Sequence, residues 1–331
     1  MNHLLVIRLS ALGDVALLAP VVKAWAAANP AVRFTVAAPP LLEPLFEGVA
    51  NIDFLGVSKK QSAVAIFRQL RDLHADAVAD MHQINRVGRA LTLLWLHEKL
   101  HLHLRFHIQT LHKGRLSRWL MLSHLSRRPR RPQYLRYADV FLRLGLQVPV
   151  LQDSDYLIST FNAQLPISTV GIAPFAQHRA KIWPLANTIR LATLLADKGY
   201  RVLLFGSKEE ASQLENIASR HQNIQSVAGR YTFREELELI RSLSVIVTMD
   251  SSNMHFASAV GTPVVSIWGA THPDFGFYGY RQDPANALCA NISCQPCSAF
   301  GQRPCRFGDY RCLEAITPEA VLAKIEETAN L

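Results

Sequence analysis

The 331-residue sequence lacks any apolar run of about 18 residues, the length that an α-helix needs to cross a membrane. It has no low-complexity tract, and 49% of its residues are hydrophobic, which is typical of a globular protein. The start of the chain has neither the cationic segment nor the cleavage site of a signal peptide. We therefore expect a cytoplasmic chain that is long enough for two domains of roughly 150 residues each.

Acidic residues are missing from one long window. Between Lys99 and Ala138 there is none, whereas ten lysines and arginines lie there, and the net charge of the whole chain is +9. Its richest basic cluster surrounds a proline and comprises Arg127, Arg128, Arg130 and Arg131. This cluster is either a solvated surface or a docking site for phosphates, carboxylates or an anionic membrane face. Aromatic residues are not interleaved with the basic ones, which argues against nucleic acid as the partner.

The start of this window alternates between polar and apolar residues. The alternation over Lys99–Ile108 predicts a strand, with one face formed by Lys99, His101, His103, Arg105 and His107. Three histidines on one strand face could bind a metal, but we favour an ordinary strand.

Cysteine is scarce as well, and all five cysteines lie between Cys289 and Cys312. Four of them are close together among proline, glycine and arginine: Cys294, Cys297, Cys305 and Cys312. In a cytosolic chain such a group more often holds a structural zinc ion than forms disulfides. The second pair is spaced more widely than the usual C-x₂-C, and reduced thiols without a metal are the alternative.

Short apolar runs alternate with helical patterns along both halves of the chain, which predicts an α/β protein with parallel sheets. A polar, proline-containing stretch at 145–166 separates the halves, so we expect domains at 1–150 and 167–331. The expected strands are Leu4–Leu9, Arg33–Ala38, Ile52–Leu55, Ala77–Ala79, Thr169–Ala173, Val202–Phe205, Val245–Thr248 and Val264–Ile267. The expected helices are Val15–Ala28, Ser62–Leu73, Tyr134–Leu144, Leu185–Lys198, Lys208–Arg220 and Met254–Val260.

Polar turns follow several of these strands, at the sheet edge where such folds bind ligands. The turn after Val245–Thr248 contains Asp250, Ser251, Ser252 and Asn253 and leads into a helix. Free N–H groups at a helix start suit a phosphate or pyrophosphate, although an ordinary capped helix is the alternative. Lys181 lies in the loop after Thr169–Ala173, where a cation would suit a diphosphate. Asp14 follows the first strand and is either a helix-stabilising acid or a general base.

Three segments resemble signature regions of the bacterial lipopolysaccharide heptosyltransferases of glycosyltransferase family 9. They are Arg8–Asp14 (RLSALGD), Lys181–Pro184 (KIWP) and Asp250–Pro263 (DSSNMHFASAVGTP). The cysteine segment at 289–312 resembles one found in the heptosyltransferase II type. The resemblance implies a GT-B fold, in which two Rossmann-like domains face each other across a cleft. It also implies inverting transfer of a heptose from ADP-heptose to an inner-core lipopolysaccharide sugar, with no metal cofactor for catalysis.

The same resemblance implies roles for individual residues. Asp14 matches the general base, Lys181 the donor-phosphate cation and Asp250 the acid that contacts the donor sugar. The diphosphate site would comprise Ser251, Ser252, Asn253 and His255, and the acid that contacts the ribose would be Glu209 or Glu210. The N-terminal domain would hold the anionic acceptor. Because the lipopolysaccharide core carries carboxylates and phosphates, the basic window favours Arg127, Arg128, Arg130 and Arg131 as its docking surface, with a solvated loop as the alternative. We also expect peripheral association with the inner face of the membrane.

Two departures from the family pattern bear on the identity of the donor. Ser252 stands where the family usually has glycine, and Ala176 and Gln177 stand where hydroxyl residues are usual. Another GT-B nucleotide-sugar enzyme, such as an epimerase, is therefore an alternative. A protein that binds an anionic glycolipid without catalysis is a second alternative, of a different class.

Overall fold

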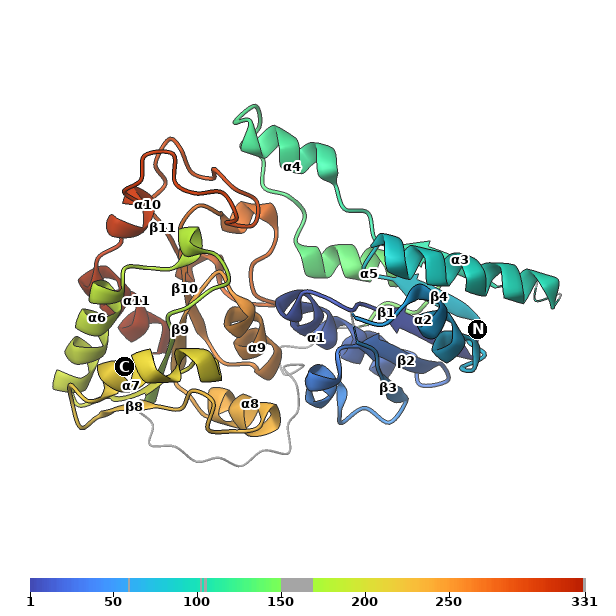
Figure 1. Cartoon of the computed structure of the whole chain (residues 1–331), viewed down its shortest axis with the longest axis horizontal. Helices are drawn as coiled ribbons and strands as arrows, with labels where there is room; N and C mark the ends of the chain where they lie inside the picture. The colour runs from blue at the N-terminus through green and yellow to red at the C-terminus, as the bar shows by residue number, and fades with distance from the viewer. Residues whose placement is uncertain (59, 102, 104–105, 150–168, 330–331) are drawn as a thin grey trace. The chain divides into compact units, whose positions relative to one another are not determined.

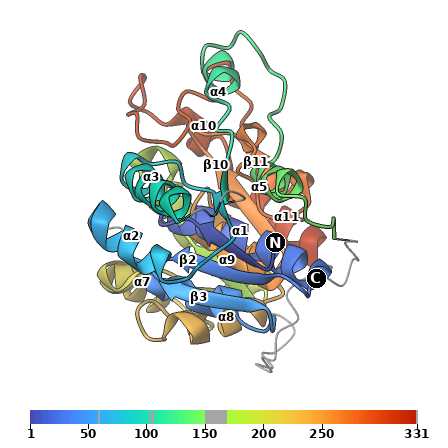
Figure 2. The same ribbon diagram turned by 90° about the vertical axis from the view of Figure 1, so that its right-hand side faces the viewer.

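The computed structural model describes residues 1–58, 60–101, 103, 106–149 and 169–329. It divides into two compact units, which Figures 1 and 2 show from two directions. The first unit comprises Met1–Lys113 and Gln133–Ile158, and the second comprises Gly114–Pro132 and Ser159–Leu331. The segment Gly114–Pro132 thus belongs to the second unit, whereas we expected it in the N-terminal domain. Most of the expected boundary at 145–166 lies outside the described residues.

The first unit is built on a parallel sheet with the strand order β3-β2-β1-β4-β5. These strands are β1 (His3–Ile7), β2 (Arg33–Ala38), β3 (Ile52–Gly56), β4 (Ala77–Asp80) and β5 (His107–Thr110). The helices are α1 (Leu12–Ala28), η1 (Pro40–Phe46), α2 (Ala63–Arg71), α3 (Asn85–Leu100) and α5 (Gln133–Arg143). Helix α1 packs beside α5, and α2 packs beside α3. All of β1 is buried, as expected of a central strand that helices cover on both faces.

The second unit has a parallel sheet of its own, with the order β11-β10-β9-β6-β7-β8. Its strands are β6 (Thr169–Ala173), β7 (Arg201–Leu204), β8 (Ile224–Ser226), β9 (Val245–Met249), β10 (Val264–Trp268) and β11 (Ala287–Cys289). Its longer helices are α4 (Arg115–Leu122), α6 (Leu185–Asp197), α7 (Ala211–Ala218), α8 (Phe233–Arg241), α9 (Ser252–Val260) and α11 (Pro318–Ala329). Short helical turns complete it: η2 (Arg179–Lys181), η3 (Lys208–Glu210), η4 (Pro273–Phe275), η5 (Pro284–Asn286) and α10 (Arg311–Glu314). Helices α6 and α11 pack together, and α8 packs on α9 (Figure 1).

The predicted α/β fold with two parallel sheets is confirmed. Eight of the expected strands, from Leu4–Leu9 to Val264–Ile267, appear within two residues of their predicted ends, because buried parallel strands are continuous apolar runs in the sequence. Helix α9 ends where Gly261 adopts a φ of 84°, a conformation that glycine reaches without strain. Within the described residues, no helix combines the length and the apolar character needed to cross a membrane.

The strand predicted over Lys99–Ile108 is wrong. Helix α3 continues to Leu100, and β5 begins only at His107, with residues 102, 104 and 105 outside the described part. The helical period prevails because Val87, Ala90, Leu91 and Leu94 lie on one face of α3, in the apolar core of the first unit. The basic and histidine side chains of this stretch therefore do not share a strand face.

The order of strands reverses once in each sheet. In the first unit the chain leaves β1 toward β2 and β3 and returns to the other side of β1 with β4. In the second unit it leaves β6 toward β7 and β8 and returns to the other side of β6 with β9. Loops that follow the two strands at such a point diverge, and the crevice between them is where open α/β sheets bind ligands. Residues after β1 and β4, and after β6 and β9, are thus the first candidates for function.

Candidate functional site

At the switch point of the second unit, loops after neighbouring strands bring together a cation, an acid and a hydroxyl. Lys181 follows β6, Asp250 follows β9 and Thr271 follows β10. The Nζ atom of Lys181 is 2.7 Å from Oδ2 of Asp250, and the Thr271 hydroxyl donates to the same oxygen at 2.8 Å. The side chains of Lys181 and Asp250 are only 15% and 11% exposed. The structure thus brings together two residues that are 69 positions apart and that the sequence assigned to one donor site.

The start of helix α9 lies directly beside this ion pair. Ser251 is its N-cap residue, with extended backbone angles, but its side chain makes no capping hydrogen bond. Among the described residues the buried Ser251 hydroxyl oxygen has no hydrogen-bond partner. The first-turn amides and this hydroxyl together form a partly positive, donor-rich surface that suits an anionic group. Ser252 and Asn253 are half-buried in this turn, and His255 is buried one turn further along.

The cysteine segment supports the loops that carry this site, a role that the sequence did not reveal. Gly301, at a φ of 79°, lies so close to the Lys181 stem that a Cβ there would approach its Cγ to 2.7 Å. The amide of Ala270 donates to the carbonyl of Ala180, and the amide of Cys297 donates to the carbonyl of Ala270, each at 3.0 Å. The loops after β6 and β10 are therefore held by a segment more than 100 residues away from Lys181 in sequence.

The acids proposed for the ribose contact lie after β7, next to β6 in the sheet. The Glu210 carboxylate accepts a hydrogen bond from the Ser207 amide at 2.7 Å, so it caps its own helical turn. Glu209 is exposed, and its own amide and then the Ser207 hydroxyl lower its pKa. Both acids stabilise a helix start in the ligand-free chain, and Glu209 is the more accessible to a ligand.

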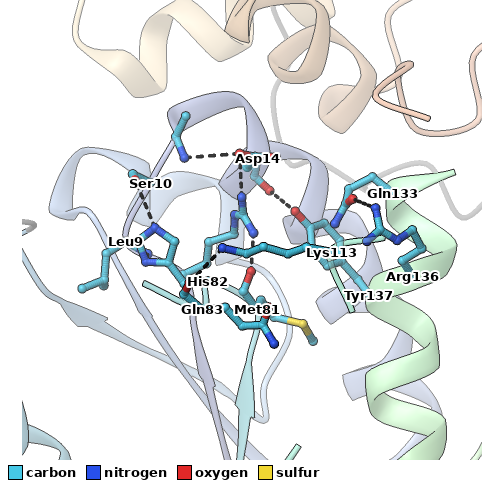
Figure 3. Close-up of polar contacts among 12 residues, drawn as sticks. Leu9, Ser10, Asp14, Met81, His82, Gln83, Lys113, Gln133, Arg136 and Tyr137 are labelled. Atoms are coloured by element: carbon cyan, nitrogen blue, oxygen red, sulfur yellow. Dashed lines mark hydrogen bonds and ion pairs between the residues drawn. The ribbon is translucent and has the colours of Figure 1, made fainter. Parts of the chain in front are cut away.

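At the switch point of the first unit, Asp14 lies in the first turn of α1, directly after β1. Its Oδ2 is 2.6 Å from Nη2 of Arg8, whose side chain is only 10% exposed (Figure 3). Burial opposes the charge on Arg8, but the carboxylate of Asp14 raises the pKa of this guanidinium above its ordinary value. Arg8 also donates to the Met81 carbonyl, and its guanidinium lies 5.6 Å from the ring centre of Tyr137. The Asp14 carboxylate, 26% exposed, is thus held in one orientation at the carboxyl end of the sheet.

A histidine that the sequence analysis missed completes this arrangement. His82 follows β4, is 4% exposed, and accepts a hydrogen bond on Nδ1 from the Leu9 amide at 3.3 Å. The ring proton therefore resides on Nε2, which donates to the Ser10 hydroxyl at 2.9 Å (Figure 3). Burial, together with the charges of Arg8 and Lys113, lowers the pKa of His82 to about 4, so the ring is neutral near pH 7. A neutral imidazole thus orders the turn that carries Asp14.

Besides Arg8, the cations Lys113 and Arg136 lie near this turn, and their positive charge would favour an anionic ligand (Figure 3). Lys113 donates to the Gln83 carbonyl at 2.8 Å, and Arg136 donates to the Gln133 side chain at 2.7 Å. Figure 3 shows Arg136 beside Gln133 and Tyr137. The sequence did not indicate that Lys113 and Arg136 are neighbours, because the loop after β5 and helix α5 meet only in the folded unit.

The four arginines around Pro129 do not form one surface. Arg130 is 8% exposed and donates to the carbonyls of Phe275 and Gly114, each at 3.2 Å, and to the Ser117 hydroxyl at 3.1 Å. It fixes the segment 114–132 to the second unit, so its predicted role in contacting the acceptor is not supported by its position. The other members, Arg127, Arg128 and Arg131, are exposed.

The cysteines Cys294, Cys297, Cys305 and Cys312 line one pocket, with Ala180 and Ala270 of the donor-side loops on its wall. All of them are free thiols, and burial raises the pKa of Cys312 to about 11. Across the described residues, no group of three or more His, Cys, Asp or Glu side chains is arranged to hold a metal ion. The four thiols thus lie around one pocket, but their side chains are not oriented to coordinate a metal ion.

Comparisons with known proteins agree with this arrangement. The model of the family described as "Glycosyltransferase family 9 (heptosyltransferase)" matches residues 110–310, more than half of the chain. Lipopolysaccharide heptosyltransferase 2 of Escherichia coli K12 is 34% identical over 137 residues, which cover 38% of this chain and 39% of that protein. The chain therefore matches about two fifths of that relative's length. The lipopolysaccharide core heptosyltransferase OpsX of Haemophilus influenzae is 22% identical over 82% of this chain and 80% of its own.

Solved structures show the same fold along nearly the whole chain. The structure of E. coli ADP-heptose LPS heptosyltransferase II has a TM-score of 0.67 at 21% identity, covering 99% of this chain and 98% of its own. E. coli heptosyltransferase WaaC with ADP has a TM-score of 0.69 at 19% identity, covering 98% and 99%. At these identities the likeness establishes the GT-B fold, as predicted.

Proposed function

The chain belongs to glycosyltransferase family 9, and on this basis we propose that it transfers a heptose from ADP-heptose to the inner core of lipopolysaccharide with inversion. The observation that carries the proposal is the cluster at the switch point of the second sheet. There Lys181 and Asp250 form an ion pair beside the start of α9, whose N-cap side chain makes no capping hydrogen bond. The relatives named above act in lipopolysaccharide synthesis, and one was solved with ADP.

On the donor side, the first-turn amides of α9 and the Ser251 hydroxyl would hold the diphosphate. Lys181 would offset the charge that develops on this leaving group as the sugar–oxygen bond breaks, so that no metal is needed. Asp250 would accept hydrogen bonds from hydroxyl groups of the sugar, as its carboxylate already does from Thr271. Ser252, Asn253 and His255 complete the turn, and Glu209, rather than the self-capping Glu210, would face the ribose.

On the acceptor side, Asp14 would act as the general base. The acceptor hydroxyl attacks the anomeric carbon while the diphosphate departs, and the hydroxyl proton passes to the Asp14 carboxylate. Arg8 keeps this carboxylate in one orientation, and the neutral His82 fixes the turn through Ser10. The cations around the turn would attract an anionic acceptor, and Arg127, Arg128 and Arg131 remain candidates for contacts with its charged groups.

We also propose two features that accompany this function. Because the acceptor is part of a membrane lipid, the enzyme would associate peripherally with the inner face of the membrane. The four thiols that line one pocket have the donor chemistry that zinc prefers, and their side chains would have to rotate to surround an ion. About one equivalent of zinc in protein purified without added metal would support a structural zinc. Absence of metal with four titratable thiols would identify a reduced cysteine loop.

The decisive experiment is incubation with ADP-heptose and a heptose-deficient core acceptor, followed by mass spectrometry of both. A heptosylated acceptor supports the proposal. An epimerised sugar nucleotide would identify the alternative enzyme class, and binding of the acceptor without turnover would identify a glycolipid-binding protein. ADP-glucose and ADP-mannose in parallel reactions would show whether Ser252, where the family usually has glycine, has changed the preferred donor.

A further inference from the structure

Helix α4 exposes large apolar side chains to solvent on one face, and clusters of this type on a globular protein often mark an interaction site. Leu116 and Trp119 on the helix are 69% and 57% exposed, and Leu125 in the loop after it is 69% exposed. Leu116 and Trp119 are three residues apart, so they lie on the same side of the helix. Figures 1 and 2 both show α4 at the periphery of the second unit, away from its sheet.

This exposure is a stable feature of the fold, because the opposite side of the segment is firmly attached. Met121, on the inner side, is 5% exposed and packs with Phe275 and Ala299. The guanidinium of Arg118 lies 5.1 Å from the ring centre of Phe300, and the buried Arg130 ties both ends of the segment to the unit. The helix is therefore fixed with one side inward, and its apolar outer side cannot turn into the core.

The charged residues that flank this face in the sequence are all basic. Arg115 precedes Leu116, Arg127 and Arg128 follow Leu125, and all three are exposed. No acidic residue occurs between Lys99 and Ala138, so no neighbour in this part of the sequence offsets their charge. A tryptophan and leucines flanked by arginines are the composition of a helix that lies in the interfacial region of an anionic bilayer.

We propose that the outer face of α4 and the loop after it dock on the anionic phospholipid surface of a membrane, with Trp119 and Leu116 inserted among the headgroups. This inference rests on the proposed function, since an acceptor that is anchored in a membrane requires the enzyme to work there. The apolar side chains supply the insertion energy, and Arg115, Arg127 and Arg128 supply the attraction to anionic lipid. On this inference Arg127 and Arg128 contact lipid headgroups rather than the acceptor saccharide, and of the exposed arginines considered above only Arg131 remains for the acceptor.

The test is co-sedimentation of the full chain with vesicles that contain phosphatidylglycerol and phosphatidylcholine but no lipopolysaccharide. We expect binding to these vesicles and little binding to phosphatidylcholine alone. Trp119→Ala should lower the partition coefficient about tenfold, and Arg127→Gln with Arg128→Gln should lower it about thirtyfold. Trp95→Ala, at an exposed tryptophan on α3 with Lys99 near its ring, is the matched apolar control. Arg220→Gln with Arg230→Gln, at exposed arginines of the second unit, is the matched charge control.

Equal binding of wild type and the Trp119 variant, or an equal loss in the Trp95 control, would overturn the proposal. So would a dimer that dissociates in Leu116→Ser with Trp119→Ser but shows no affinity for vesicles, because the face would then join two copies. Transfer to a water-soluble, delipidated acceptor should be unchanged in Leu116→Ser with Trp119→Ser. If wild type binds vesicles but transfers no heptose to that acceptor, the docking surface stands and the proposed function fails.

Discussion

Replacing Lys181 by methionine should destabilise the protein, because the carboxylate of Asp250 would then be largely buried without its cationic partner. The substitution keeps the length of the stem that packs on Gly301 and removes only the ammonium group, 2.7 Å from Asp250. Removing one partner of a buried ion pair costs about 3–5 kcal/mol, because the remaining charge is uncompensated. Since Thr271 still donates to Asp250, and both side chains keep some exposure, we expect a loss of about 3 kcal/mol in the free energy of unfolding.

Urea unfolding followed by tryptophan fluorescence measures this loss, since Trp183 and Trp268 are buried in the second unit. Adding Asp250→Asn to Lys181→Met removes the unpaired carboxylate charge and should restore about 2 kcal/mol of the free energy of unfolding. Lys198→Met breaks a comparable but exposed pair with Glu326 and should leave stability unchanged. ADP affinity, measured by calorimetry, should fall in the single and the double variant alike. A Lys181→Met protein as stable as wild type would refute the buried-pair reasoning, and unchanged ADP affinity would refute the donor assignment.

Three further variants test other parts of the site. Asp14→Asn should lower kcat by about 10²–10⁴ with little change in ADP affinity, and near-wild-type turnover would exclude Asp14 as the base. The pKa of His82 is about 4 in the fold against an ordinary 6.5, so the unfolded chain binds this proton more tightly. Neutral His82 therefore contributes fully to the free energy of unfolding above pH 6.5, and about 3 kcal/mol of that free energy should be lost as the pH falls toward 4. His82→Gln should flatten this pH dependence in urea titrations, and an unchanged pH dependence would contradict the assignment. Arg130→Ala should lower the free energy of unfolding by about 2–4 kcal/mol, because the carbonyls of Phe275 and Gly114 would lose their buried donor. Arg127→Ala should have the melting temperature of the wild type, and equal melting temperatures for the two variants would contradict the structural role of Arg130.

Much of the architecture follows from local sequence. The strands of both sheets are short apolar runs, and each is followed by turn residues, so their existence, type and order could be predicted from the chain alone. The turn after β9 is an example, because Asp250–Asn253 mark a helix start and Gly261 marks its end. Asp14 and Lys181 could be identified for the same reason, since each lies just after a recognisable strand.

The local sequence pattern gave a wrong prediction where a polar–apolar alternation began inside a helix. Lys99–Ile108 alternates as a strand would, but Lys99 and Leu100 form the last turn of α3. The helix is fixed by Val87, Ala90, Leu91 and Leu94, which lie earlier in α3 and pack in the core, so tertiary packing outweighs the local alternation. The four arginines around Pro129 are a second case. Their sequence indicates one basic patch, whereas burial of Arg130 against Phe275 and Gly114 assigns it to the framework.

The sequence by itself determined the repeating strand–helix units, the turns that end them and the residues placed at the carboxyl ends of the strands. Only the tertiary structure decided which of these turns meet. Thr271 reaches Asp250, His82 reaches Ser10 and Gly301 reaches Lys181 because parallel strands align the ends of distant segments. Such contacts join residues that are 21 to 120 positions apart, and no local propensity encodes them. They depend on strand order, which the packing of the whole sheet selects.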